Sequence, residues 1–403
     1  MQLTGPFTQI LPLAGLALKG PLRDDQLQVI AGGGILTEGN SIVAVGDFEV
    51  LRKQHPLAEV NEIQGDHLLL PGFIDCHTHI CYAGSRANDY ALRLQGRSYL
   101  EIANAGGGIW DSVTKTRAAS EDELSGLLLQ RAKRHLSQGI TTIEVKSGYG
   151  LETGTELKQL DVIKKVSGQT GINLIPTCLA AHMLPHDYVG SQPEYLDHII
   201  HDLLPLVRNR KLANRVDIFI EQSAFSAYDA LIYLNKAKQL GFDLTVHADQ
   251  FTTGGSAVAV KMGAVSADHL EASTDTEIKL LSESDTVAVV LPGASLGLGL
   301  PYAPARKLLD AGACVAIASD WNPGSAPMGE LLMQAAVMSA AEKITTAEVF
   351  AGLTSRAAKA LNLTDRGTLE PGKMAHMQGY PCSDYREILY HQGMLKPYFI
   401  KTN

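Results

Sequence analysis

The sequence has few cysteines and no large excess of basic charge, and each of these features excludes a class of protein. Five cysteines, an odd number, are scattered over 403 residues without CxxC spacing, so neither a disulfide framework nor a cysteine-type zinc site is indicated. The 34 basic and 43 acidic side chains give a formal charge of −9, which offers nucleic acid or an anionic membrane no basic surface. We therefore expect a cytoplasmic protein with a small-molecule partner, and neither a nucleic-acid partner nor a membrane.

Long hydrophobic runs are also missing. The apolar stretch "ILPLAGLAL" near the start has no basic residues before it and is too short to span a bilayer. Neither a signal peptide nor a membrane anchor is therefore expected. The 45% of hydrophobic residues and 19% of charged residues are typical of an ordinary globular protein, which at this length can contain one large barrel and an accessory module.

Short β segments dominate the two ends of the chain, while short β-branched runs alternate with amphipathic stretches between them. The eight candidate strands of the middle region are "LLPGFIDCH", "TTIEVK", "NLIPTCL", "VDIFIEQ", "DLTVHA", "AVSADH", "TVAVVL" and "CVAIAS". Eight strands are what a (β/α)8 TIM-like barrel requires. We predict an α/β fold, with a barrel domain over residues 68–365 and a small β-sandwich module in which residues 1–67 and 366–403 pair.

Polar side chains stand at the ends of several predicted strands, where a barrel of this type carries its catalytic groups. These side chains are His77, His79, Lys146, His247, His269 and Asp320. Alternation along an extended chain turns His77 and His79 to one side and Cys76 to the other. Each residue alone could be an ordinary polar residue leaving a strand, but the whole set on one face of the barrel favours a functional site.

Imidazole nitrogens and a carboxylate on the first, fifth and eighth strands are suitable ligands for one divalent cation. The predicted metal ligands are His77, His79, His247 and Asp320. This donor set suits Zn2+ and Fe2+ alike.

The HxH motif after the first strand, the single histidine of the fifth and the aspartate after the eighth resemble the amidohydrolase superfamily of metal-dependent hydrolases. The stretches "AGSRAN", "KSGYGL" and "NPGS" further resemble one of its families, whose members open an imidazolone ring that carries a propionate in histidine breakdown. The resemblance implies hydrolysis of a carbon–nitrogen bond in a cyclic amide, and enzymes of this kind are often homodimers.

The catalytic residues that this chemistry implies are Asp320 and His269. A metal-activated water would attack the ring carbonyl carbon, and Asp320 is placed to take the water proton and pass it to the departing nitrogen. His269 is expected to hydrogen-bond the carbonyl oxygen.

Substrate recognition is predicted to depend first on Arg86, on the loop after the first strand. Its planar guanidinium suits a carboxylate, although an ordinary loop salt bridge is the competing interpretation, and the resemblance assigns it the propionate. The resemblance also implies that the pocket contains Tyr99, Tyr149, His182, Gln250, Asn322, Gly324 and Ser325. Gln250 cannot be a general base because its amide does not accept a proton, so that role stays with Asp320.

Lys146 permits a second interpretation of the metal site, as a carboxylated lysine that bridges two ions. Such a site would require two more histidines, which could only be His182 and His269. The resemblance gives both of them other roles, so we favour one metal.

Two other functions are compatible with a barrel of this kind. A deaminase of a nucleobase-like ring would use similar metal ligands, but it would not need Arg86 for an anionic tail. A non-catalytic barrel that has lost its metal is the other alternative, and the intact set of predicted ligands argues against it.

Overall fold

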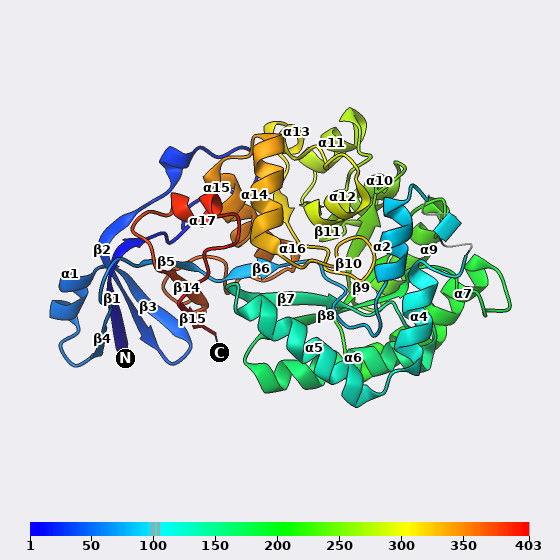
Figure 1. Cartoon of the computed structure of the whole chain (residues 1–403), viewed down its shortest axis with the longest axis horizontal. Helices are drawn as coiled ribbons and strands as arrows, with labels where there is room; N and C mark the ends of the chain where they lie inside the picture. Colours follow the sequence, from blue (N-terminus) through cyan, green and yellow to red (C-terminus); the bar gives the residue numbers. More distant parts are fainter. Residues whose placement is uncertain (98–100, 103–104, 403) are drawn as a thin grey trace.

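Eight parallel strands form the main body of the protein in its computed structural model, which describes residues 1–97, 101–102 and 105–402. They lie side by side in the order of the sequence, from β6 to β13 (Figure 1). The strands are β6 (Phe73–Asp75), β7 (Ile140–Lys146), β8 (Asn173–Ala181), β9 (Arg215–Ile218), β10 (Asp243–Ala248), β11 (Ser266–His269), β12 (Val287–Val290) and β13 (Val315–Ile317). The predicted TIM-like barrel is confirmed.

Helices connect successive strands and cover the outside of the barrel, as parallel strands require (Figure 1). They are α2 (Ala87–Leu94), α4 (Ile109–Ala118), α5 (Glu121–Leu136), α6 (Thr153–Thr170), α7 (Gln192–His198), α8 (Leu204–Asn209), α9 (Ala227–Gln239), α10 (Gly255–Met262), α11 (Asp275–Ser282), α12 (Pro292–Leu298), α13 (Ala305–Asp310), α14 (Leu331–Glu342), α15 (Thr346–Gly352) and α16 (Ser355–Ala360). Among the described helices, none combines the length and the apolarity that a membrane span requires.

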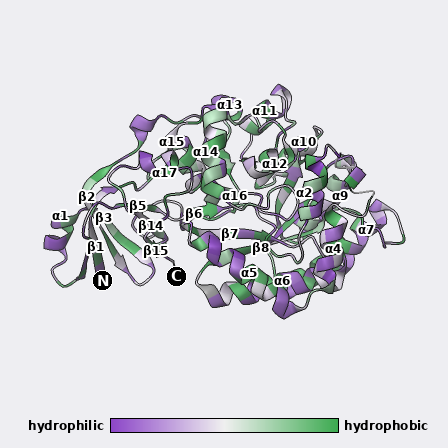
Figure 2. Cartoon of the chain, in the orientation of Figure 1, coloured by the Kyte–Doolittle hydropathy of each residue, from purple (hydrophilic) through white to green (hydrophobic). Residues whose placement is uncertain are grey.

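Helix α5 illustrates how the sequence produces these outer helices. It begins after Ser120, whose side chain accepts a hydrogen bond from the backbone N–H of Glu123. Leu124, Leu128 and Ala132 repeat every four residues and are buried, so one stripe of the helix faces the barrel. Figure 2 shows hydrophilic and hydrophobic residues alternating along α5, whereas α14 is hydrophobic over most of its length.

A second, smaller sheet lies beside the barrel and contains strands from both ends of the chain (Figure 1). Its strands are β1 (Gln2–Ile10), β2 (Ile30–Glu38), β3 (Ser41–Asp47), β4 (Glu59–Glu62), β5 (Leu68–Pro71), β14 (Met377–Tyr380) and β15 (Phe399–Lys401), accompanied by helices α1 (Phe48–Gln54) and α17 (Arg386–Tyr390). Their order is β15-β14-β5-β1-β2-β3, with β4 beside β1. The exact division of the chain into two domains stays a prediction.

The run "LLPGFIDCH", which we expected to be one barrel strand, is instead two strands in two different sheets. Strand β5 pairs with β1 and β14 of the small sheet, whereas β6 pairs with β7 of the barrel. Only Gly72 lies between them, and a Cβ atom at this position would overlap the side chain of Thr141. Both strands are buried, and apart from Asp75 both are apolar, so hydrophobicity alone does not reveal the break.

The barrel closes between its first and last strands through individual hydrogen bonds. Asp75 at the end of β6 accepts a hydrogen bond from the backbone N–H of Ser319 at 3.0 Å. One residue further along, the backbone N–H of Asp320 donates to the carbonyl oxygen of His77 at 3.1 Å. The two chain segments that carry three of the predicted metal ligands are therefore joined directly.

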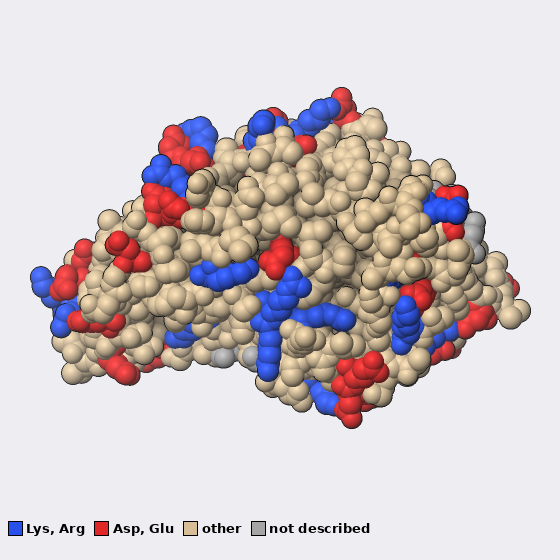
Figure 3. Space-filling model, in the orientation of Figure 1, with Lys and Arg blue, Asp and Glu red and all other residues tan. Residues whose placement is uncertain are grey.

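Acidic and basic side chains are interspersed over the face of the molecule in Figure 3, with uncharged surface between them. This distribution agrees with the modest negative charge of the sequence.

We predict that Gly72→Ala lowers the free energy of unfolding by about 1 to 3 kcal/mol, because the added methyl group overlaps Thr141 in a closely packed crossing. The matched control is Gly126→Ala in the exposed middle of α5, where a Cβ meets no atom within 4 Å. That change should stabilise the protein by roughly 0.5 to 1 kcal/mol. Urea unfolding monitored by circular dichroism measures both, and equal effects of the two substitutions would contradict the crossing argument.

Candidate metal centre and substrate pocket

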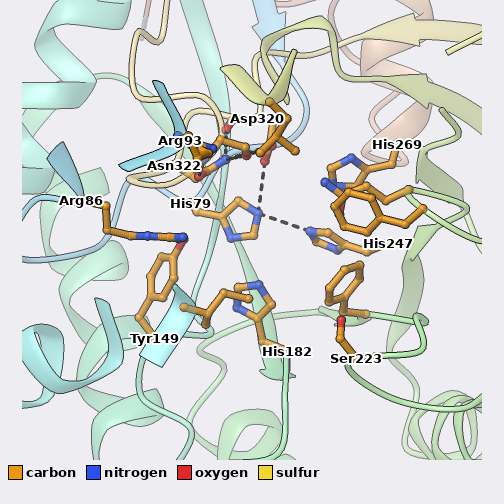
Figure 4. A pocket seen from close by; sticks show the side chains of 16 residues that line it. His79, Arg86, Arg93, Tyr149, His182, Ser223, His247, His269, Asp320 and Asn322 are labelled. Carbon is orange, nitrogen blue, oxygen red and sulfur yellow. Dashed lines mark hydrogen bonds and ion pairs between the residues drawn. The ribbon is translucent and has the colours of Figure 1, made fainter. Parts of the chain in front are cut away.

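Three histidines and one aspartate meet at the carboxyl end of the barrel, and Figure 4 shows His79, His247 and Asp320 pointing toward one another. The Nε2 atom of His79 lies 3.2 Å from Nε2 of His77 and 3.3 Å from Nε2 of His247. Oδ1 of Asp320 lies 3.5 Å from Nε2 of both His77 and His79. All four side chains are buried, so the structure brings the four predicted metal ligands together.

Four separations between donor atoms, from 3.2 to 3.5 Å, are close to the roughly 3.3 to 3.4 Å between ligand atoms that lie about 2.0 to 2.1 Å from a tetrahedral zinc ion. The mutually close ligand atoms form two groups, His77 with His79 and His247, and His77 with His269 and Asp320. Three imidazoles and one carboxylate are also a donor set that divalent transition metals prefer. The residues present therefore fit a divalent metal ion.

Burial keeps the ligand histidines in the form that binds a metal. It lowers the pKa of His77 and His79 well below the usual value, and that of His247 to about 3. A neutral imidazole offers a nitrogen lone pair, whereas a protonated one does not. A proton therefore does not compete for these ligands near neutral pH.

Two buried carboxylates orient two of the ligand histidines. Nδ1 of His77 donates to Oδ2 of Asp268 at 2.6 Å, and Nδ1 of His247 lies 2.9 Å from Oδ2 of Asp217. A carboxylate on Nδ1 leaves Nε2 free to face a metal. Neither Asp217 nor Asp268 was predicted to have a role. A charged residue inside a buried strand is nevertheless unusual and marks a candidate functional residue.

Lys146 lies beneath the ligands and is itself buried. Its Nζ atom is 2.8 Å from Oε1 of Glu144 and 2.9 Å from Oδ2 of Asp217. Burial alone would lower the pKa of Lys146, but Asp217, Glu144 and Asp268 together raise it above its ordinary value. An ammonium group surrounded by carboxylates is not a carboxylated lysine, which argues against the two-metal interpretation.

Asp320 faces the histidines with one oxygen and its own loop with the other. Oδ2 accepts hydrogen bonds from Nδ2 of Asn322 at 2.9 Å and from Oγ of Ser325 at 3.2 Å. Burial raises the pKa of Asp320 to about 6. A carboxylate in this range can accept and release a proton near neutral pH.

Asn322 was predicted as a substrate contact, and its amide is also used inside its loop. Besides donating to Asp320, it accepts hydrogen bonds from the backbone N–H groups of Gly324 and Ser325 at 2.7 and 2.8 Å. These bonds fix the turn that carries Asp320. This internal role was not visible in the sequence.

A cavity opens above the ligands. It is lined by His79, Arg86, Arg93, Ile109, Tyr149, His182, Phe219, Ser223, His247, Gln250, Phe251, His269, Leu298, Asp320, Asn322 and Ser325. Most of the predicted pocket residues are among them, whereas Tyr99 lies outside the described residues. The pocket residues that were not predicted, because their positions carry no motif, are Arg93, Ile109, Phe219, Ser223, Phe251 and Leu298.

Arg86 forms the loop salt bridge that was the competing interpretation of its role, and it also lines the pocket. Its Nε donates to Oδ2 of Asp89 at 2.9 Å, and its guanidinium lies at the pocket wall beside Tyr149 (Figure 4). Gly324 is the predicted pocket residue behind it, where a Cβ atom would overlap the guanidinium. Arg93 closes the same wall by donating from Nη2 to the carbonyl oxygen of Gly324 at 2.8 Å.

Two further histidines reach the pocket in different environments. Nδ1 of His182 lies 2.9 Å from the carbonyl oxygen of Gly148 and donates to it, while burial lowers its pKa to about 4. Burial would also lower the pKa of His269, but the carboxylate of Glu271, 3.4 Å from Nδ1, raises it. His269 has a φ of 91° at the end of β11, a strained conformation of a kind that clusters at functional sites.

Comparison with known proteins connects this geometry to a family. A sequence profile described as "Amidohydrolase family" matches residues 99–378. The imidazolonepropionase of Myxococcus xanthus is 42% identical over 84% of this chain and 81% of its own length. That of Fusobacterium nucleatum is 40% identical over 92% of this chain and 90% of its own length.

Among solved structures, an adenosine deaminase from Xanthomonas campestris with bound zinc superposes with a TM-score of 0.71. The superposition covers 100% of this chain and 91% of the deaminase at 18% sequence identity. At that identity the likeness shows the fold alone.

We predict that His247→Ala loses most of its metal and its catalytic activity together while its far-ultraviolet circular dichroism remains that of the wild type. The reason is that the substitution removes a ligand at the top of the barrel and leaves the packing of the strands in place. His201→Ala, at an exposed histidine outside the pocket, is the matched control and should retain both. Elemental analysis of the purified proteins measures the metal, and full metal content in His247→Ala would exclude this site.

Proposed function

The chain belongs to the imidazolonepropionase family of amidohydrolases, and from this premise we propose how its residues open the ring of 4-imidazolone-5-propanoate to N-formimidoyl-L-glutamate. This hydrolysis breaks a carbon–nitrogen bond of a cyclic amide in histidine degradation. The observation that carries the proposed roles is one pocket in which the metal-fitting cluster and the guanidinium of Arg86 face the same space.

The reaction adds one water to the ring amide. The water oxygen bonds to the carbonyl carbon, the carbon–nitrogen bond breaks, and one water proton goes to the departing nitrogen. A Zn2+ or Fe2+ ion held by His77, His79, His247 and Asp320 would supply Lewis-acid chemistry, because such ions lower the pKa of bound water toward neutrality.

We assign the proton transfer to Asp320. Its Oδ1 points into the cluster, while hydrogen bonds from Asn322 and Ser325 to Oδ2 keep the carboxylate from rotating. The carboxylate of Asp320 accepts a proton from the water and later donates it to the ring nitrogen. Gln250 lines the same pocket, but its amide is limited to hydrogen bonding.

We assign stabilisation of the carbonyl oxygen to His269. His269 is the last residue of β11, and its ring lines the pocket on the opposite side of the cluster from Arg86 (Figure 4). The nearby Glu271 carboxylate, 3.4 Å from Nδ1, orients the ring so that Nε2 can donate to the oxygen on which negative charge develops.

We assign the propionate to Arg86. The ion pair with Asp89 uses Nε, so the planar group is held in one orientation at the wall of the pocket. A guanidinium fixed in this way binds a carboxylate through parallel N–H groups. The other substrate contacts that we propose are Tyr99, Tyr149, His182, Gln250, Asn322, Gly324 and Ser325.

We further propose a cytoplasmic location and a homodimer. All five cysteines are free, which agrees with a reducing compartment. Light scattering on the purified protein tests the oligomeric state.

We predict that Asp320→Asn reduces kcat by about a hundredfold to ten-thousandfold, because an amide cannot carry the proton between the water and the ring nitrogen. Some metal should remain, since three histidine ligands are unchanged. Steady-state kinetics combined with elemental analysis separates the two effects. Near wild-type turnover at full metal content would assign the base to another residue.

Arg86→Ala should reduce kcat/KM for imidazolonepropionate by roughly thirtyfold to a thousandfold, the equivalent of about 2 to 4 kcal/mol for a charge-assisted contact in a partly desolvated pocket. Arg86→Lys should recover part of the loss, because an ammonium supplies the charge without the planar fork. Arg306→Ala, which removes an arginine paired with Glu348 away from the pocket, is the control and should have near wild-type kinetics.

The same experiment tests the function as a whole when a ring analogue without the carboxylate is assayed in parallel. The wild type should hydrolyse the analogue slowly, and Arg86→Ala should scarcely change that rate. An equal loss on both substrates would make Arg86 structural. Release of ammonia from aminated bases, without turnover of imidazolonepropionate, would replace the proposed reaction with deamination.

A further inference from the structure

A single buried ammonium group lies beneath the metal-fitting cluster, and the proposed mechanism gives it no task. The side chain of Lys146, at the end of β7, is 1% exposed. Its Nζ lies 2.8 Å from Glu144, 2.9 Å from Asp217 and 3.9 Å from Asp268. Removing ionised groups from water destabilises a protein unless their pairing is close, so these contacts are expected to hold all four groups in fixed places.

Two of the three carboxylates continue to a metal ligand. Oδ2 of Asp217 faces Lys146 on one side and Nδ1 of His247, at 2.9 Å, on the other. Oδ2 of Asp268 is also the oxygen that accepts the hydrogen bond from His77 at 2.6 Å. A displacement of either carboxylate would therefore rotate the ring of a ligand.

The third carboxylate reaches the backbone between His77 and His79. Oε2 of Glu144 accepts a hydrogen bond from the backbone N–H of Thr78 at 3.1 Å, and Oγ1 of Thr78 donates to the carbonyl oxygen of Glu144 at 2.6 Å. Thr78 separates His77 from His79 in the HxH motif. Glu144 thus holds the segment that carries both histidines.

We propose that Lys146 is the positioning residue of the metal centre, acting on three of its ligands through three carboxylates. This inference rests on the proposed function and adds to it a residue that contacts neither substrate nor metal. The three carboxylates surround one point and repel one another, and the ammonium at that point keeps their spacing. Without the ammonium group the carboxylates would separate, and the imidazole rings that contact them would no longer point toward one metal position.

The consequence is a division between metal binding and substrate binding. Lys146 is not among the residues that line the described pocket, so its removal leaves Arg86 and the other proposed substrate contacts in place. A defect in positioning therefore affects the metal and kcat, with a much smaller change in KM.

The test is Lys146→Met, which removes the charge and shortens the side chain by one atom, in protein loaded with Co2+. The visible absorption spectrum reports the coordination geometry of the cobalt, and a chelator measures the rate of metal loss. We expect an altered spectrum, metal loss faster by about tenfold to a hundredfold, and a comparable fall in kcat, because residues that orient metal ligands have effects of this size. KM should change by less than about threefold.

Ile143→Val, at a buried apolar residue of the same strand, is the matched control for general destabilisation and should retain the wild-type cobalt spectrum. The double variant of Lys146→Met and Asp217→Asn should lose metal more slowly than the product of the two single effects predicts, because both act on His247. A folded Lys146→Met protein with a wild-type spectrum and wild-type metal loss would overturn the proposal.

Glu144→Gln provides the test if Lys146→Met does not fold. It removes one charged contact and keeps an amide oxygen for Thr78, and it should accelerate metal loss several-fold; an unchanged rate would contradict the proposal. If the wild type binds metal but does not hydrolyse imidazolonepropionate, the proposed function fails, whereas the cobalt spectra still decide the role of Lys146.

Discussion

Buried negative charge needs a compensating positive charge, and this requirement organises the interior of the barrel. Glu144, Asp217, Asp268 and Asp320 are all removed from water, and Lys146 is the ammonium among them. Burial raises the pKa of Asp268 to about 7 and that of Asp320 to about 6, as expected of carboxylates that lack enough positive charge nearby. A divalent cation among the three histidines would supply the remaining positive charge. The fold and the metal site are therefore parts of one electrostatic arrangement.

Much of this architecture could be predicted from the sequence, for identifiable reasons. Parallel strands place their carboxyl ends on one face, so HxH, His247 and Asp320 were expected to converge as soon as eight strands were counted. Alternation in an extended chain correctly placed His77 and His79 together. The identity of the reaction came from resemblance and from relatives about 40% identical over most of the chain, since a ligand set alone is shared by hydrolases of many rings.

The parts that could not be predicted depend on contacts between distant segments. Alternation says which way Asp217 and Asp268 point, but the histidine that each one meets lies on another strand. The same limit applies to Asn322, which the resemblance placed among the substrate contacts and whose amide forms hydrogen bonds within its own loop. The run over residues 69–77 concealed a change of sheet, because burial in either sheet selects mostly apolar residues.

The direct passage from β5 through Gly72 into β6 leaves no room for inserted residues between the two strands. Insertions are tolerated where a loop can bulge into solvent, but one buried glycine offers no such loop. The chain thus passes from the small sheet into the metal-binding strand without an intervening loop, and the histidines follow within seven residues of that glycine. The small sheet therefore fixes the position of the first barrel strand. A barrel transplanted without the small sheet would lose this support for the segment on which the active site begins.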